Sequence, residues 1–225
     1  MLVISFKASD KLVTFLEEKN ISFIKTTKNP NLDPRISDHP DLSIFPLDKD
    51  NIVVASGVYD YYKENLPHKN IIRGEKVSRK YPQDAIYNIV KFKDYYIHND
   101  HTEKTVEKYF KDNKISHLPV KQGYTKCSTI VLKESILTAD YGIYKALKDK
   151  VRVILLSEDI IKLDGFDKGF IGGTCGLIED KLIFTGDIRK HKSYDLIKKE
   201  CERENIDIIY PETELVDLGS FININ

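Results

Sequence analysis

Apolar and polar positions along this chain follow one order that recurs. At 123–148 an alternating stretch is broken by the polar turn "LKES", returns as a second apolar stretch, and continues through an Asp into an amphipathic segment. The same order occurs at 40–65, 81–113 and 165–205. A further short apolar strand follows each amphipathic segment, at 70–72, 115–120, 151–157 and 206–210. A recurring pattern of this length indicates an array of similar supersecondary units.

Each unit predicts a hairpin followed by a helix and one more strand. Period-2 alternation around a polar turn is typical of a hairpin. Asp140 stands where a carboxylate accepts a backbone N–H at the start of a helix. Ile143, Ala146 and Leu147 then fall on one helical face. A lone unit cannot bury both of its faces, so the units must pack side by side.

The length predicts five such units. The chain has 225 residues, and division by about 45 per unit gives five. The fifth unit is split, because 218–225 supplies its first strand and 1–26 supplies a strand, a helix and a strand. We therefore predict one domain, 1–225, with an α/β fold: a five-bladed pseudo-symmetric propeller with helices outside and strands lining a central channel. A doubly wound sheet is the alternative, which the hairpins disfavour because they require antiparallel neighbours. The segment 26–37 is expected to be a linker at the channel rim.

Composition and charge narrow the classes of function. Lys and Arg number 35, and so do Asp and Glu, which gives a net charge of zero. Nucleic-acid binding relies on a basic face, so no nucleic-acid partner is expected. No apolar run reaches the length of a membrane span, and the N-terminus lacks the pattern of a signal peptide. Three cysteines without metal-type spacing favour a reducing, cytoplasmic location. The oligomeric state does not follow from the sequence.

Polar residues gather at the start of each unit. In a ring these segments meet at one end of the channel, where converging acids and amides predict a pocket for a small-molecule ligand. We expect the channel mouth to be acidic, although Asp and Gly at such positions also serve simply as turn residues. The carboxylates expected there are Asp41, Asp84, Asp140, Asp164, Asp167 and Asp217.

Cys127 and His39 are the candidates for catalysis. Lys126 is expected to lower the pKa of the Cys127 thiol, although a buried structural cysteine is the alternative. Cys175, in "GGTCG", is the rival thiol. His39 lies between two aspartates that would hold it cationic, unless it is a surface turn residue. His98 and His101 are three apart, but nothing near them completes a metal site, so no metal is expected.

Several runs of this sequence resemble one fold family. A five-unit propeller with a Cys, a His and acids in its channel resembles the penteins, or guanidino-group-modifying enzymes, which include arginine and agmatine deiminases, dimethylarginine hydrolases and amidinotransferases. From about Asp38 onward the chain is more closely similar to an uncharacterised bacterial, largely clostridial, group with that fold. The runs that carry this closer similarity are "DHPDL", "YPQDAIYN", "VKQGYTKCS", "GFDKGFIGG", "FTGD" and "DLGS".

The resemblance implies a role for particular residues. Cys127 would be the nucleophile that attacks a guanidinium carbon, His39 the acid/base, and no cofactor would be needed. The candidate substrate-binding residues are Asp41, Asp84, Asn88, Lys126, Asp140 and Asp167.

The sequence also departs from that family. Its enzymes are mostly longer, carry their Cys near the C-terminus, and have Glu-Gly-Gly-Asp or His-Cys segments that are absent here. Penteins without catalysis exist as well, among them a ribosomal anti-association factor. Two functions follow: a cysteine-dependent hydrolase or amidinotransferase for a guanidine or amidine, or a non-catalytic module that binds a small cation or a protein.

Overall fold

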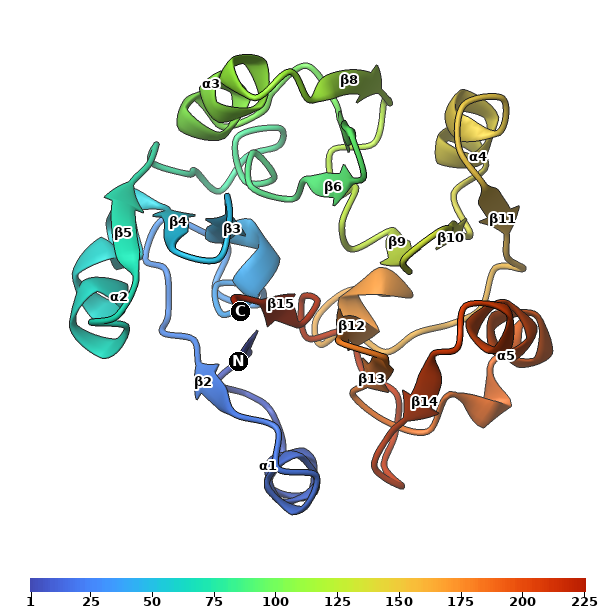
Figure 1. Cartoon of the computed structure of the whole chain (residues 1–225). Coiled ribbons are helices and arrows are strands. Elements are labelled where there is room, and N and C mark those ends of the chain that lie inside the picture. Colours follow the sequence, from blue (N-terminus) through green and yellow to red (C-terminus); the bar gives the residue numbers. More distant parts are fainter.

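Five three-stranded sheets surround a central axis in the computed structural model, which describes residues 1–225. Figure 1 looks along this axis and shows one helix outside each sheet. The sheets are β3 (Ile44–Pro46), β4 (Asn51–Val54) and β5 (Asn70–Arg73); β6 (Val90–Phe92), β7 (Tyr95–His98) and β8 (Ser116–Pro119); β9 (Thr129–Val131), β10 (Ile136–Thr138) and β11 (Val153–Leu155); β12 (Cys175–Ile178), β13 (Lys181–Phe184) and β14 (Asp207–Ile209); and β15 (Ile222–Asn223), β1 (Leu2–Ile4) and β2 (Phe23–Lys25).

Every sheet has the same topology. The innermost strand pairs antiparallel with the middle strand, and the middle strand pairs parallel with the outermost one. An α-helix makes the crossover between the two parallel strands, as parallel pairing requires. In the sheet that the termini share, Val3 pairs with Ile222 and Ile4 with Lys25. The predicted five-unit propeller is confirmed, and it consists of five separate sheets rather than one closed barrel.

The helices follow from caps and apolar faces. Ser9, Glu103 and Asp140 each accept a backbone N–H at the start of a helix. One stripe of each helix is buried against the strands, such as Val106 and Phe110. The α-helices are α1 (Asp10–Glu18), α2 (Tyr59–Asn65), α3 (Lys104–Asp112), α4 (Tyr141–Leu147) and α5 (Tyr194–Arg203), with short 3-10 helices η1 (Pro40–Leu42), η2 (Ser56–Val58), η3 (Gly172–Thr174) and η4 (Ile188–Lys190).

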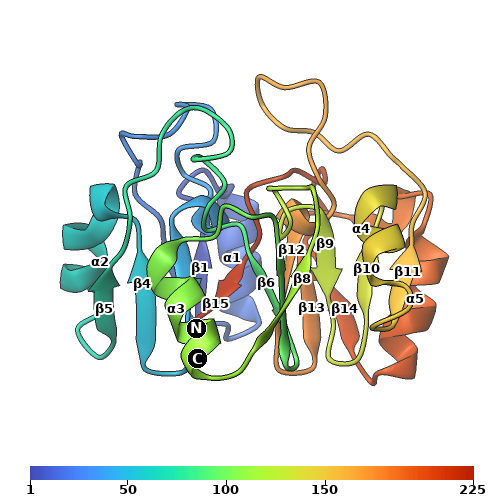
Figure 2. The same cartoon turned by 90° about the horizontal axis from the view of Figure 1, so that it is seen from above.

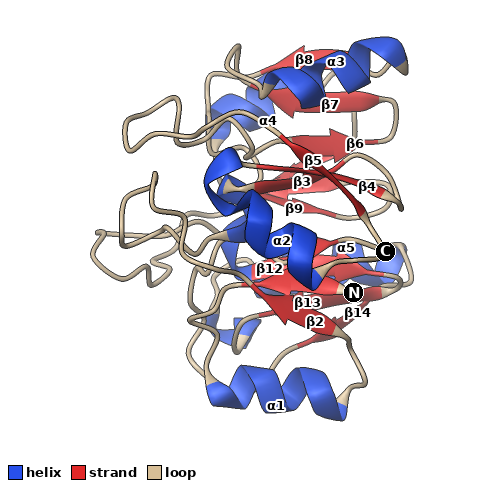
Figure 3. Cartoon of the chain, turned by 90° about the vertical axis from the view of Figure 1, so that its left-hand side faces the viewer, coloured by secondary structure: helices blue, strands red, loops and turns tan.

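The two ends of the propeller differ. The hairpin turns and both termini lie at one end, whereas the long loops project from the other (Figures 2 and 3). The predicted linker 26–37 contains no helix or strand. It is nevertheless packed, because Arg35 donates to the Gly165 carbonyl at 2.7 Å and lies over the Phe166 ring at 4.0 Å. No helix combines the length and the apolar character that crossing a membrane requires.

Candidate functional site

A ring of five residues surrounds the axis at the loop end of the propeller. Each residue lies two or three positions before an innermost strand, so the repeated fold brings the five together. The backbone joins neighbours in this ring: the Gly173 N–H donates to the Cys127 carbonyl at 3.0 Å, and the Ser220 N–H donates to the Gly173 carbonyl at 3.2 Å. The members of this axial ring are Asp41, Asn88, Cys127, Gly173 and Ser220.

The Cys127 thiol is held by two side chains of this ring. Its Sγ donates to Asp41 Oδ2 at 3.0 Å and accepts from Asn88 Nδ2 at 3.1 Å. The Cys127 N–H donates to Asn88 Oδ1 at 3.0 Å, which fixes the orientation of the amide. All three residues are buried, with Cys127 only 3% exposed. Three of the residues selected from the sequence therefore meet at one point.

Asp217 is a second buried carboxylate beside the ring. It accepts the Phe170 N–H at 2.8 Å and the Gly219 N–H at 3.0 Å. Its place depends on a glycine, because a Cβ at Gly173 would lie 2.0 Å from Asp217 Oδ1. The sequence analysis expected Asp217 at the channel mouth but did not select it as a substrate-binding residue. Its segment "DLGS", which was among the runs that resemble the family, was the signal that could have identified it.

Burial and nearby carboxylates keep the thiol protonated. Burial raises the pKa of Cys127 well above its ordinary value, and the negative charges of Asp41 and Asp217 raise it further. Burial also raises the pKa of both carboxyl groups. The pKa of Cys127 is thus raised rather than lowered as expected from Lys126, whose charge is not among the main causes of the shift. The charge of Lys126 acts instead on Asp41 and Cys175, and its side chain lines an axial cavity of about 360 Å³ that also reaches Asp41.

His39 lies beside this group without bonding to the thiol. Its ring makes no hydrogen bond. Burial lowers the pKa of His39 by more than the negative charges of Asp217 and Asp38 raise it. The shift is therefore opposite in direction to the one expected from the two aspartates. The surface-turn alternative is wrong, since the residue is buried. One reason for the lowered pKa is that Lys7 Nζ lies 2.7 Å from Asp38 Oδ1 and balances that charge.

Asp84 bonds to the aromatic residue Tyr124 rather than to a member of the ring. The Tyr124 hydroxyl donates to Asp84 Oδ2 at 2.5 Å, while Asp84 Oδ1 is buried without a partner. Burial is the main cause that raises the pKa of the Tyr124 phenol, and the charges of Asp84 and Cys127 raise it further. The Tyr124 ring stacks on Phe170 with centroids 6.0 Å apart. Sequence reasoning did not select Tyr124 or Phe170, although both lie in the segments that it identified.

Asp140, Asp164 and Asp167 do not reach the ring. Asp140 follows the middle strand β10 rather than preceding an innermost strand, and its carboxylate caps α4. Asp164 and Asp167 are exposed in the long loop before η3. The expected acidic ring is thus reduced to Asp41, Asp217 and the more distant Asp84.

The remaining candidate groups are engaged in packing. Cys175 lies in an apolar cluster, and burial raises its pKa to about 12. Cys201 is buried on α5 in the same cluster. The two ring nitrogens of His98 bond to Thr102 Oγ1 and to the carbonyls of Ala85 and Gly123, whereas His101 is exposed.

Comparison with known structures defines the fold class. Dimethylarginine dimethylaminohydrolase from Pseudomonas aeruginosa, complexed with citrulline, superposes with a TM-score of 0.55 at 12% identity over 92% of this chain and 82% of that one. C. jejuni agmatine deiminase gives 0.55 at 12% identity over 93% and 74%. The N-terminal domain of ArgZ, an arginine dihydrolase from cyanobacteria, gives 0.53 at 14% identity over 96% and 83%. The chain has the pentein fold of these proteins.

The family model gives a narrower assignment. Residues 3–222 match the family of unknown function DUF6873, and the chain belongs to that family. No curated protein matches it in sequence.

Proposed function

We propose that this protein is a thiol-dependent enzyme that modifies the guanidino or amidino group of a small molecule, by hydrolysis or by amidino transfer. The observation that carries this proposal is the Cys127 thiol 3.0 Å from Asp41 Oδ2, on the axis of the fold. The named activities of the similar structures, which act on methylated arginine, agmatine and arginine, give it further support.

The unpaired carboxylates favour a cationic substrate. Asp41 Oδ1 is buried without a partner, and a buried carboxylate without a cation is costly in its charged form. A guanidinium presents a planar fork of donors that matches carboxylates. Its positive charge would also oppose the effect of Asp41 and Asp217 on the thiol, so the pKa of Cys127 would fall when substrate binds. We therefore expect the thiol to be activated by its substrate.

The residues of the ring are sufficient for the covalent step. The Cys127 S–H proton passes to the Asp41 carboxylate, and the thiolate attacks the guanidinium carbon to form a C–S bond. The C–N bond to the leaving amine then breaks, and the proton held by Asp41 goes to that amine. Water next attacks the amidino carbon and gives a proton to the Asp41 carboxylate. The C–S bond then breaks to release a urea (from an amidine, an amide), and the Cys127 thiolate takes the proton back from Asp41. An amine acceptor in place of water gives amidino transfer. No cofactor enters this sequence.

A cationic electrophile tests the proposal. Chloroacetamidine carries an amidinium, and chloroacetamide is its neutral counterpart of similar size. Intact-protein mass spectrometry measures the rate at which each reagent alkylates Cys127 at pH 7. Each rate is divided by the rate at which the same reagent alkylates glutathione, which corrects for the intrinsic reactivity of the reagent. We expect a preference for the amidine of about tenfold or more, since charged hydrogen bonds contribute about 1.5–3 kcal/mol. Asp41→Asn should abolish the preference, Cys127→Ala should abolish labelling at this position, and Cys175→Ala should change neither. Equal normalised rates for both reagents would overturn the proposal.

A binding module is the second candidate function. The raised pKa of Cys127 and the absence of any hydrogen bond from the His39 ring favour it. In that case n-propylguanidine would bind reversibly, with a Kd that Asp41→Asn weakens. No amine, urea or covalent adduct would then form on prolonged incubation.

A further inference from the structure

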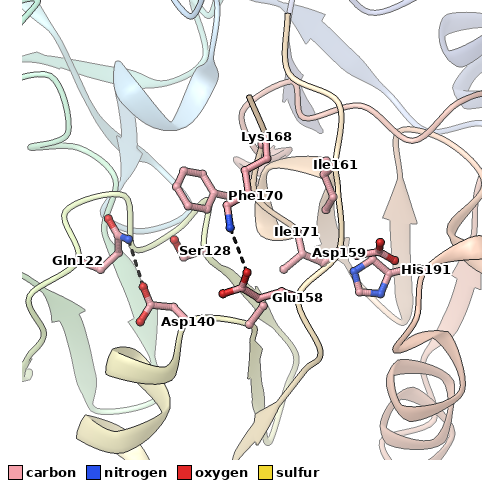
Figure 4. A pocket seen from close by; sticks show the side chains of 12 residues that line it. Gln122, Ser128, Asp140, Glu158, Asp159, Ile161, Lys168, Phe170, Ile171 and His191 are labelled. Carbon is pink, nitrogen blue, oxygen red and sulfur yellow. Dashed lines mark hydrogen bonds and ion pairs between the residues drawn. The ribbon is translucent and has the colours of Figure 1, made fainter. Parts of the chain in front are cut away.

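A separate cavity lies between the β9–β11 and β12–β14 sheets at the loop end. Its volume is about 260 Å³, and none of the five axial-ring residues lines it. About 15 Å³ is enough for one water, so this cavity has room for a small organic molecule. Figure 4 shows its walls, where Ile161, Ile171 and Phe170 supply apolar surface.

Ser128 brings an unused polar atom to this cavity. The residue is 3% exposed, and its Oγ has no hydrogen-bond partner. An unpaired buried hydroxyl costs free energy that a bound partner would recover. Thr138 Oγ1 donates to the Ser128 carbonyl at 2.8 Å and accepts the Asp140 N–H at 3.1 Å. The Ser128 hydroxyl and the Asp140 carboxylate are therefore fixed to the same pair of strands.

Asp140 contributes a carboxylate that no cation balances. Its Oδ1 accepts the Ile143 N–H at 2.9 Å, and its Oδ2 accepts from Gln122 Nε2 at 3.2 Å. Both donors are neutral, and no ion pair includes this side chain. Gln122 is itself held in place, because its Oε1 accepts the Tyr124 N–H at 3.0 Å. The carboxylate is thus positioned before any ligand arrives.

The other charges at the cavity are already paired. Glu158 Oε2 lies 3.1 Å from Lys168 Nζ (Figure 4). Asp159 accepts the Lys192 N–H at 2.9 Å and lies 3.5 Å from Lys192 Nζ. The His191 Nδ1 accepts the Ser193 N–H at 3.1 Å, so this nitrogen carries no proton, and burial lowers the pKa of the ring. One negative charge, at Asp140, is left over.

We propose that this cavity is a second ligand site, where Asp140 and Ser128 bind the ammonium group of a small organic amine and the apolar walls contact its carbon chain. The site does not depend on the chemistry of Cys127. Ser128 follows Cys127 directly, and Phe170 bonds to Asp217 through its N–H, so the bound amine would lie behind one wall of the axial ring.

Calorimetric titration with three matched probes tests this site. The n-butylammonium ion carries the charge and the chain, n-butanol has the chain without the charge, and butyrate has the opposite charge. We expect only n-butylammonium to bind, with one site per chain. Asp140→Asn should weaken its binding about tenfold or more, and Ser128→Ala several-fold, as expected for a charged and a neutral hydrogen bond. Asn is also a good N-cap, so α4 should persist, which circular dichroism would check.

Two control variants separate this site from the axial ring. Asp167→Asn removes a carboxylate from the exposed loop nearby and should leave the Kd unchanged. Cys127→Ala removes the thiol and should also leave it unchanged. If Cys127→Ala or Asp41→Asn abolishes binding while Asp140→Asn does not, the amine occupies the axial ring and the second site is refuted. Equal binding of butyrate, or no binding at concentrations on the order of 10 mM, refutes it as well. None of these results bears on the labelling test of Cys127.

Discussion

Cys127 and Cys175 occupy neighbouring segments of the propeller and are almost equally buried, at 3% and 1% exposed, but they lie in different regions. Cys127 belongs to the polar ring on the axis, with a carboxylate and an amide within 3.1 Å of its sulfur. Cys175 is the first residue of β12 and lies in an apolar cluster, with only two carbonyl oxygens near its sulfur, at 3.8 and 3.9 Å.

The difference lies in position relative to the strand. The equivalent of Cys127 in the next sheet is Gly173, which also lies two residues before its innermost strand. The equivalent of Cys175 in the β9–β11 sheet is Thr129, the first residue of its strand. Two positions along the chain therefore separate the residue before β12 that belongs to the axial ring, Gly173, from the one that lies in the apolar cluster, Cys175. Burial alone does not distinguish a functional thiol from a packing one, whereas its neighbours do.

Removing a large side chain from the apolar region should have the largest effect. Phe184 is fully buried in the cluster that holds Cys175, and it pairs with Cys175 across the strands. Phe184→Ala should lower the free energy of unfolding by about 3–5 kcal/mol, because the loss of apolar burial and the cavity both destabilise. Urea denaturation measures this value. Leu196→Ala, at a partly exposed position on α5, is the control and should change it by less than about 0.5 kcal/mol. A loss below about 1 kcal/mol for Phe184→Ala would contradict the assignment of this cluster as core.

In the polar ring, by contrast, one side chain, Asp41, should lower the free energy of unfolding at neutral pH. Folding raises the pKa of Asp41 above its usual 3.8, so the folded state binds more protons than the unfolded state above that pH. The contribution of Asp41 therefore falls as pH rises from about 4 through the folded pKa. Each unit by which the pKa is raised corresponds to about 1.4 kcal/mol.

The isosteric variant Asp41→Asn isolates this contribution. Its free energy of unfolding, minus that of the wild type, should increase between about pH 4 and pH 7. The exposed Asp167→Asn is the control for the loss of one negative charge, because that side chain lies in a solvent-exposed loop. A difference for Asp41→Asn that decreases with pH would mean that the carboxylate is stabilised by a cation in the folded protein.

The sequence predicts the fold better than it predicts the site. The repeated pattern sets five units, and the cap at Asp140 follows from local rules, since these depend on residues close in the chain. Asp41, Asn88 and Cys127 were found because they share one position in the repeat. Asp140 and Asp217 both lie beside strand ends, but Asp140 follows the middle strand β10, whereas Asp217 precedes the innermost strand β15, and the sequence reasoning did not separate these two positions. The lowered pKa of His39 likewise depends on burial and on Lys7, which is distant in sequence.

The smallest expected effect concerns Lys126. If this lysine lowered the pKa of Cys127, Lys126→Ala would slow alkylation of the thiol markedly. The structure gives the thiol a raised pKa, to which burial, Asp41 and Asp217 contribute and Lys126 does not. We therefore expect Lys126→Ala to change the rate of Cys127 alkylation by chloroacetamide at pH 7 by less than about twofold. Neutral chloroacetamide brings no cation to offset the charge of Asp41, which raises the pKa of the thiol in the free protein. Asp41→Asn should therefore accelerate the same reaction, because a rise in the thiolate fraction of about tenfold follows each unit by which the pKa falls. Mass spectrometry of the labelled peptide measures both rates, with the buried Cys175 as an internal reference. A strong slowing by Lys126→Ala would mean that the lysine activates the thiol, and would contradict the conclusion that burial and the neighbouring carboxylates set the pKa of Cys127.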